Sequence, residues 1–363
     1  MKKFINKYNV LLFLPLLLLM ISSFFCMYQA KFVKDIYSMH LVKQILWFFI
    51  GFFILFILRK VKIRFFFHYS FYFYVFSLLL LFLVLFFGKE INGSKAWFSF
   101  KFFNFQPSEF MKISLLLYLS KLTDDFHYHK REFFYLFKCF IVTLLPSILV
   151  FLEPDTGAII FYFLLLFSSY VLSGIRKRWF VLAFLIFSLV MGTFIYLYLF
   201  KQDFLIHYLG TSIFYRMDRL IHFKEGSGMQ INNALITIGN SGLWGSFLQN
   251  SLLYVPEFPT DFVFTLLISL FGFVGGSLLI VCLFTLCYYF INLLTQTQDL
   301  SYKIFIHGFL YLFLFQQIYN IFMNLGLVPI MGIPLPFLSY GGSNMIVYFI
   351  FLGLILNIKK RTY

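Results

Sequence analysis

A short acidic segment before an apolar run carries the best candidate for acid–base chemistry in this sequence. Glu257 and Asp261 lie in this segment, residues 256–262, with Asp261 at its edge. A carboxylate at such an edge loses part of its hydration, which raises its pKa toward the range useful for a general base. We therefore predict Asp261 as a catalytic base and Glu257 as a substrate-binding candidate. The structural alternative is that Thr260 caps the following helix and Asp261 interacts with its dipole.

Cationic side chains suited to binding phosphate occur in two places. Lys112 follows Glu109 by three residues, so the two share a helix face and can pair. Arg216 and Arg219 have the same spacing, and paired arginines suit bidentate phosphate binding. The structural alternatives are an internal salt bridge for the first pair and, for the arginines, an interfacial helix whose cations meet anionic lipid headgroups.

Two turn-forming segments add further polar candidates. In residues 153–157, a proline ends one helix and Asp155 or Thr156 can cap the next, so Asp155 is a candidate for orienting the site. Residues 332–343 contain two prolines and Ser339, and they cannot form a continuous helix. Irregular backbone at membrane depth is tolerated where protein or a water-filled cavity covers it. We therefore predict a re-entrant turn lining a cavity, with Ser339 as a binding candidate.

These residues must be positioned by membrane-spanning helices. The chain has 363 residues, of which 61% are hydrophobic and 12% charged, too few charges to cover a soluble domain. About 18 or more consecutive apolar residues can cross a membrane. We predict an all-α integral membrane protein, a single polytopic domain over 1–363. Its ten apolar runs are 9–29, 44–58, 65–87, 107–120, 134–152, 156–173, 179–200, 261–290, 304–328 and 344–358.

The distribution of basic residues predicts the orientation. With a cytoplasmic N-terminus, 17 of the 29 Lys and Arg fall in inner segments and 10 in outer ones. Both termini are therefore predicted inside, and the large loop 201–260, between helices 7 and 8, outside. This bias accounts for the net charge of +15 and argues against nucleic-acid binding. The four cysteines lie in predicted spans, and their spacing predicts neither a disulfide framework nor a metal site.

Several blocks of the chain resemble, in order, the SEDS family of shape, elongation, division and sporulation proteins (RodA, FtsW, SpoVE). The resemblance covers nearly the whole chain and leans toward RodA, because of Phe105-Gln106 and the short length. The blocks that carry it are 93–97, 105–109 with Lys112, 153–157, 236–243, 256–262 and 332–343.

The resemblance implies ten helices in a bacterial cytoplasmic membrane and peptidoglycan glycosyltransferase activity on its outer face. The implied substrate is lipid II, a disaccharide-pentapeptide on undecaprenyl diphosphate, and the implied partner is a class B penicillin-binding protein. Asp261 matches the family's proposed catalytic aspartate. Lys112, Arg216 and Arg219 are then candidates for neutralising the leaving diphosphate, with a divalent cation, Mg²⁺ or Mn²⁺, as a possible cofactor.

Four positions depart from the family pattern. Ser269 and Leu270 stand where the family often has paired glutamates, Ala96 where it usually has arginine, and Ser246 where lysine is common. These departures keep two alternatives open, a transporter that flips lipid II and a weakly active scaffold for a penicillin-binding protein. The carboxylates at outer helix edges favour surface chemistry over transport.

Overall fold

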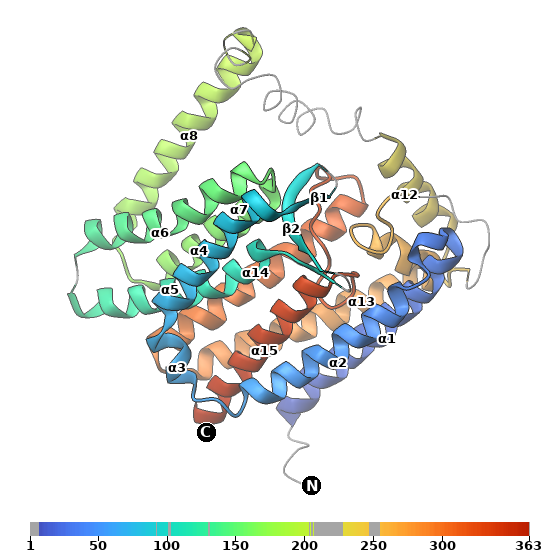
Figure 1. The fold of residues 1–363 in the computed structure, drawn as a ribbon, viewed down its shortest axis with the longest axis horizontal. Coiled ribbons are helices and arrows are strands. Elements are labelled where there is room, and N and C mark those ends of the chain that lie inside the picture. The colour runs from blue at the N-terminus through green and yellow to red at the C-terminus, as the bar shows by residue number, and fades with distance from the viewer. Residues whose placement is uncertain are drawn as a thin grey trace.

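The fold is a bundle of long helices, with a small sheet and irregular segments at one end (Figure 1). The computed structural model describes residues 7–91, 93–100, 103–129, 131–202, 204, 206, 228–246 and 255–362. The long helices are α1 (Lys7–Val33), α2 (His40–Leu58), α4 (Ser70–Phe87), α5 (Pro107–His129), α6 (Glu132–Leu152), α7 (Thr156–Leu172), α8 (Lys177–Phe200), α13 (Val263–Gln296), α14 (Leu300–Asn324) and α15 (Gly342–Thr362).

Each of the ten predicted apolar runs is largely helical, although the run 65–87 is divided between α3 (Ile63–His68) and α4. Within the described residues, eight helices are long and apolar enough to cross a membrane. The other two are α7, with 17 residues, and α5, which carries several charges; their crossing stays a prediction. Helix α5 can hold charged residues because it packs among α4, α6, α7 and α14, with nearly all of 107–120 buried.

The sheet is absent from the all-α prediction. β1 (Lys89–Ile91), β2 (Ser94–Ser99) and β3 (Asn104–Phe105) form an antiparallel sheet in the order β1-β2-β3. Gly93 turns the chain between β1 and β2 with φ 79°, a conformation that glycine adopts without strain. The strands are short, and pairing with the neighbouring strand sets their register. They therefore have no periodic sequence pattern from which they could be predicted.

The predicted loop 201–260 contains a helix, α12 (Gly228–Asn240). Its buried residues Ile231, Ala234 and Thr237 recur every three positions and face the bundle. α12 packs on α13 and α14. This part of the loop is therefore ordered by an amphipathic face that the sequence prediction overlooked.

Helix α13 is broken at Gly272, where φ is 64° and ψ −160°, although the sequence predicts one unbroken span. Residues 241–246 fill the break: the amides of Phe273 and Val274 donate to the carbonyls of Gly242 (3.0 Å) and Leu243 (3.1 Å). A Cβ on Gly272 would lie 2.4 Å from the backbone nitrogen of Gly245. The break therefore requires glycine, and it leaves a nine-residue half-helix, 263–271.

The two ends of the bundle differ. α1 begins and α15 ends at one end, whereas the sheet, α12 and the irregular segment before α15 lie toward the other (Figure 1). This arrangement agrees with both termini lying on one side of the membrane, and the cytoplasmic assignment of that side stays a prediction. A short helix, α3 (Ile63–His68), and a 3₁₀ turn, Asp35–Tyr37, connect neighbouring spans.

Candidate active site

Asp261 lies in the turn that enters α13, as the sequence predicts. Its side chain is half-buried, and a Cβ on Gly332 would lie 4.0 Å from its Oδ2 atom. Burial, which is the larger effect, and the negative charge of Glu257 together raise the pKa of Asp261 from 3.8 to about 7. At neutral pH, the carboxylate is therefore present and basic enough to accept a proton.

Two asparagines on α14 hold the backbone of Asp261. The Nδ2 group of Asn320 donates to the carbonyl oxygens of Asp261 (2.9 Å) and Ile333 (2.8 Å). The Nδ2 group of Asn324 donates to the same Asp261 oxygen at 3.0 Å. The Oδ1 atom of Asn324 accepts from the amide (3.1 Å) and the hydroxyl (2.7 Å) of Thr265. This asparagine clamp, Asn320 and Asn324, fixes both walls around Asp261.

The asparagine clamp is not among the residues predicted from the sequence. Both side chains are fully buried and lie four residues apart, on one face of α14. Polar side chains inside membrane helices are costly, and they usually mark interhelical hydrogen bonds or functional pathways. Two asparagines at this spacing in an apolar run are the signal that could have identified them.

Glu257 and Thr260 shape the turn rather than cap the helix. The amides of Thr260 and Asp261 donate to the carbonyl of Glu257 at 3.2 and 3.0 Å. The Thr260 hydroxyl donates to Oε2 of Glu257 at 2.9 Å. The N-cap of α13 is Phe262, without a side-chain cap bond, so the structural alternative in which Thr260 caps this helix is wrong. Glu257 has φ 53°, a conformation that is uncommon for non-glycine residues.

The segment 329–341 is non-helical, as predicted, and packs on the Asp261 turn. The hydroxyl of Ser339 donates to the carbonyl of Thr260 (2.5 Å) and accepts from the amide of Leu335 (2.8 Å). The amide of Tyr340 donates to the carbonyl of Pro259 at 2.9 Å. Ser339 is buried and joins the two segments, so its hydroxyl has an internal role, and its contact with substrate stays a prediction.

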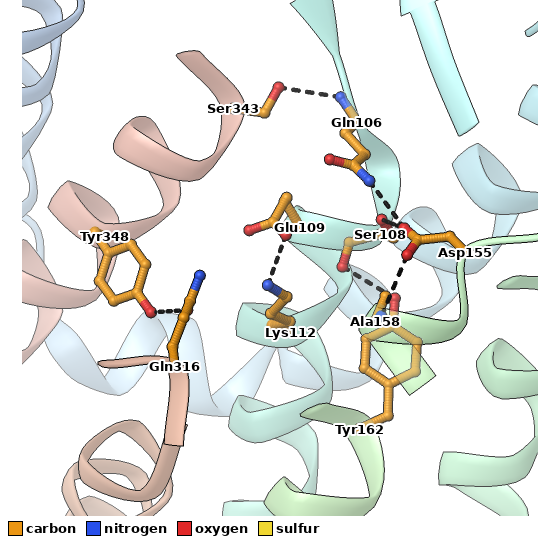
Figure 2. Close-up of polar contacts among 10 residues, drawn as sticks. All are labelled: Gln106, Ser108, Glu109, Lys112, Asp155, Ala158, Tyr162, Gln316, Ser343 and Tyr348. Atoms are coloured by element: carbon orange, nitrogen blue, oxygen red, sulfur yellow. Dashed lines mark hydrogen bonds and ion pairs between the residues drawn. The ribbon is translucent and has the colours of Figure 1, made fainter. Parts of the chain in front are cut away.

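Asp155 is the N-cap of α7, as predicted (Figure 2). Its Oδ1 atom accepts from the amide of Ala158 at 3.3 Å, and its Oδ2 atom accepts from Nε2 of Gln106 at 2.9 Å and the hydroxyl of Ser108 at 3.3 Å. These bonds tie the start of α7 to the start of α5. A Cβ on the nearby Gly157 would lie 3.9 Å from the carbonyl of Met331, so Asp155 supports the segment that reaches Asp261.

Glu109 and Lys112 form the predicted salt bridge inside the bundle (Figure 2). Nζ of Lys112 lies 2.6 Å from Oε1 of Glu109 and 4.3 Å from the centre of the Phe161 ring. Lys112 is 1% exposed. Oε2 of Glu109 has no hydrogen-bond partner among the described residues. The geometry therefore favours an internal role for Lys112, and phosphate binding by it stays a prediction.

Glu153 is a second buried acid in this region; the sequence places it at an outer helix edge but not among the binding candidates. Its side chain is fully buried, and within the described part of the chain neither carboxyl oxygen has a partner. Burial raises the pKa of Glu153 to about 9, with a smaller contribution from the charge of Asp155. Glu153 is therefore neutral at pH 7.

The remaining predicted positions divide into two groups. Arg216 and Arg219 lie outside the described residues. Among the departures from the family pattern, Ala96 is buried in β2, and the amide of Ser246 donates to the carbonyl of Ser269 at 2.9 Å. The positions where the family has lysine and glutamate are thus neighbours in this fold, and both are neutral here.

The acidic residues offer limited ligands for a divalent cation. Within the described ranges, no group of three His, Cys, Asp or Glu residues is arranged to hold a metal. Asp261 and Glu257 interact as neighbouring carboxylates. Mg²⁺ commonly binds one or two carboxylates and takes its other ligands from substrate phosphate and water. This pair fits such a cation only together with a phosphorylated substrate.

Comparison with known proteins identifies relatives along almost the whole chain. The family model FTSW_RODA_SPOVE, described as "Cell cycle protein", matches residues 8–363. A "Probable peptidoglycan glycosyltransferase FtsW" of Buchnera aphidicola subsp. Schizaphis graminum is 30% identical over 332 residues, 87% of this chain and 89% of the relative. The FtsW of Pseudomonas fluorescens, with the same description, is 34% identical over 75% of this chain and 66% of its own length.

Two solved structures have the same fold. The crystal structure of the rod shape determining protein RodA of Thermus thermophilus matches with a TM-score of 0.65 and 26% identity, over 96% of both chains. A chain from "Structural coordination of polymerization and crosslinking by a peptidoglycan synthase complex" matches with a TM-score of 0.75 and 25% identity. That match covers 96% of this chain and 97% of the other. The leaning toward RodA stays a prediction.

Proposed function

The chain belongs to the FtsW/RodA/SpoVE (SEDS) family of multi-pass bacterial inner-membrane proteins, and from this premise we propose that it is a peptidoglycan glycosyltransferase. Its substrate would be lipid II, which it would polymerise into glycan strands on the outer face of the membrane. The observation that carries the proposal is Asp261: a half-buried carboxylate, with a pKa raised to about 7 and a backbone fixed by the asparagine clamp.

In the proposed reaction, Asp261 accepts the proton of a sugar hydroxyl on the incoming lipid II. The hydroxyl oxygen forms a bond to the anomeric carbon of the growing strand, with inversion at that carbon. The bond from this carbon to the diphosphate breaks, and undecaprenyl diphosphate leaves with the electron pair. Asp261 then releases its proton to water. A base with a pKa near the working pH is suited to this transfer.

The leaving diphosphate needs positive charge near Asp261. We assign this role to Arg216 and Arg219, because Lys112 is buried against Glu109. A divalent cation held by Glu257 and the diphosphate would supply further charge neutralisation. The proposed partner is a class B penicillin-binding protein, by analogy with the peptidoglycan synthase complex whose chain shares the fold.

The test is reconstitution of the purified chain in liposomes with lipid II, with and without the partner and Mg²⁺ or Mn²⁺. Glycan strands and lipid II translocation are measured in the same preparation. Strand synthesis is the expected result. Translocation without strands would favour the transporter. Partner binding without strands under every metal condition would favour the scaffold, which the neutral pair Ser246 and Ser269 keeps open. Either outcome would overturn the proposal.

A further inference from the structure

An apolar groove lies between α8 and the pair α6 and α7. It encloses about 600 Å³, the size of pockets that hold drug-sized ligands. Its walls are aromatic and aliphatic side chains from all three helices, with phenylalanine predominant. They include Phe137, Phe140, Phe167, Phe180, Phe184 and Phe187. A cavity with these walls suits a hydrocarbon chain.

Helix α8 leaves the groove open to the surroundings. No residue in the apolar window of α8 is buried, and the helix leans away from the bundle (Figure 1). Its start is fastened to α6 by Glu132, whose Oε2 accepts from Nε1 of Trp179 at 2.8 Å. The same carboxylate pairs with Arg176 at 3.4 Å and Arg178 at 3.6 Å. The groove is therefore anchored at one end.

The anchored end has a cationic rim, which we define as Arg131, Arg176, Lys177 and Arg178. All four side chains are exposed, and Glu132 is the one acid within residues 131–132 and 176–178. The rim lies at the bundle end opposite Asp261. Helix α5 begins beside the sheet, at the end of the bundle that holds Asp261, and runs to the other end, where α6 begins next to Arg131. By the positive-inside rule, this is the cytoplasmic end.

The depth of the groove matches one leaflet. Trp179 and Phe187 both line it, and at 1.5 Å per residue their separation spans about 12 Å. One leaflet is half of a hydrocarbon core of about 30 Å, so its thickness is similar to the depth of the groove. An acyl chain in the groove would thus place its headgroup at the cationic rim, where Arg and Lys attract anionic lipids.

We propose that this groove binds an anionic phospholipid of the inner leaflet, with its acyl chain among the phenylalanines and its phosphate on the cationic rim. The charge complementarity of the rim selects a lipid over an apolar partner helix. The site is separate from Asp261 and does not depend on the proposed function.

The test uses the full chain in detergent, with phosphatidylglycerol or phosphatidylcholine added, and measures bound lipid by native mass spectrometry and the melting temperature. The rim variant is Arg131→Gln/Lys177→Gln, which leaves the Glu132 contacts intact. The control is Lys60→Gln/Lys62→Gln, which removes the same charge from exposed positions at the same end. Ala183→Trp fills the groove, because Ala183 lines it.

We expect phosphatidylglycerol, but not phosphatidylcholine, to bind and raise the melting temperature. The rim variant should bind it about thirty-fold more weakly, since each cation near an anionic headgroup contributes about 1 kcal/mol. The control should bind like the unmodified chain, and Ala183→Trp should lose binding. Equal binding of both lipids, equal loss in the control, or unchanged binding by Ala183→Trp would each overturn the proposal.

Discussion

Removing one member of the asparagine clamp should slow the proposed reaction without weakening substrate binding. Asn320→Ala deletes the two hydrogen bonds to the carbonyls of Asp261 and Ile333, at 2.9 and 2.8 Å. A buried hydrogen bond contributes about 1 kcal/mol net, so the loss is about 2 kcal/mol. If this energy positions Asp261 for proton transfer, kcat falls by about thirty-fold and KM changes little.

A matched control separates positioning from stability. Asn357 is also buried, and its Nδ2 group donates to the carbonyls of Leu58 and Val61 at the opposite end of the bundle. Asn357→Ala should lower the melting temperature as much as Asn320→Ala while its kcat stays near that of the unmodified chain. The assay is glycan strand synthesis from lipid II per folded molecule. If both variants lose the same fraction of kcat, the clamp has no specific role at Asp261 and the reasoning fails.

Three further results are expected. The rate of strand synthesis should rise with pH through about 7 as Asp261 loses its proton, and Glu257→Gln should move this limb to lower pH, because the negative neighbour no longer raises the pKa; a limb that stays in place would contradict the coupling. Gly272→Ala should sharply reduce the folded yield, since its Cβ would lie 2.4 Å from the backbone of residue 245. Gly192→Ala, with open space around it, should not reduce the yield. Equal yields by size-exclusion chromatography would refute the requirement for glycine at the break in α13. Lys112→Met should destabilise the fold by about 3–5 kcal/mol by leaving a buried carboxylate unpaired, and an unchanged denaturation midpoint would exclude this.

Local chemistry made much of the site predictable. Asp155 caps α7 because its short carboxylate reaches the first turn. Glu109 and Lys112 pair because their spacing places them on one helix face. Asp261 was found because a carboxylate beside an apolar run is costly.

The features that escaped prediction depend on contacts between distant segments. No proline in the sequence predicts the break at Gly272. The break forms because carbonyls in residues 241–246 accept hydrogen bonds from the amides that the break leaves free. Asn320 and Asn324 stand out as paired polar residues in an apolar run, but only the fold shows that they contact the distant Asp261. Thr260 has a capping residue's chemistry, but its hydroxyl donates to Glu257 and its carbonyl accepts from the distant Ser339. In each case, tertiary structure chose between local options.

The most direct test of the central claim compares the unmodified chain with Asp261→Asn, both purified with the partner. Fluorescent lipid II binding and the rate of strand synthesis are measured on the same samples. Because a positioned general base contributes about 10²–10⁴-fold, the variant should bind lipid II with unchanged affinity and synthesise strands at least about a hundred-fold more slowly. Strand synthesis by Asp261→Asn at the unmodified rate would contradict the account.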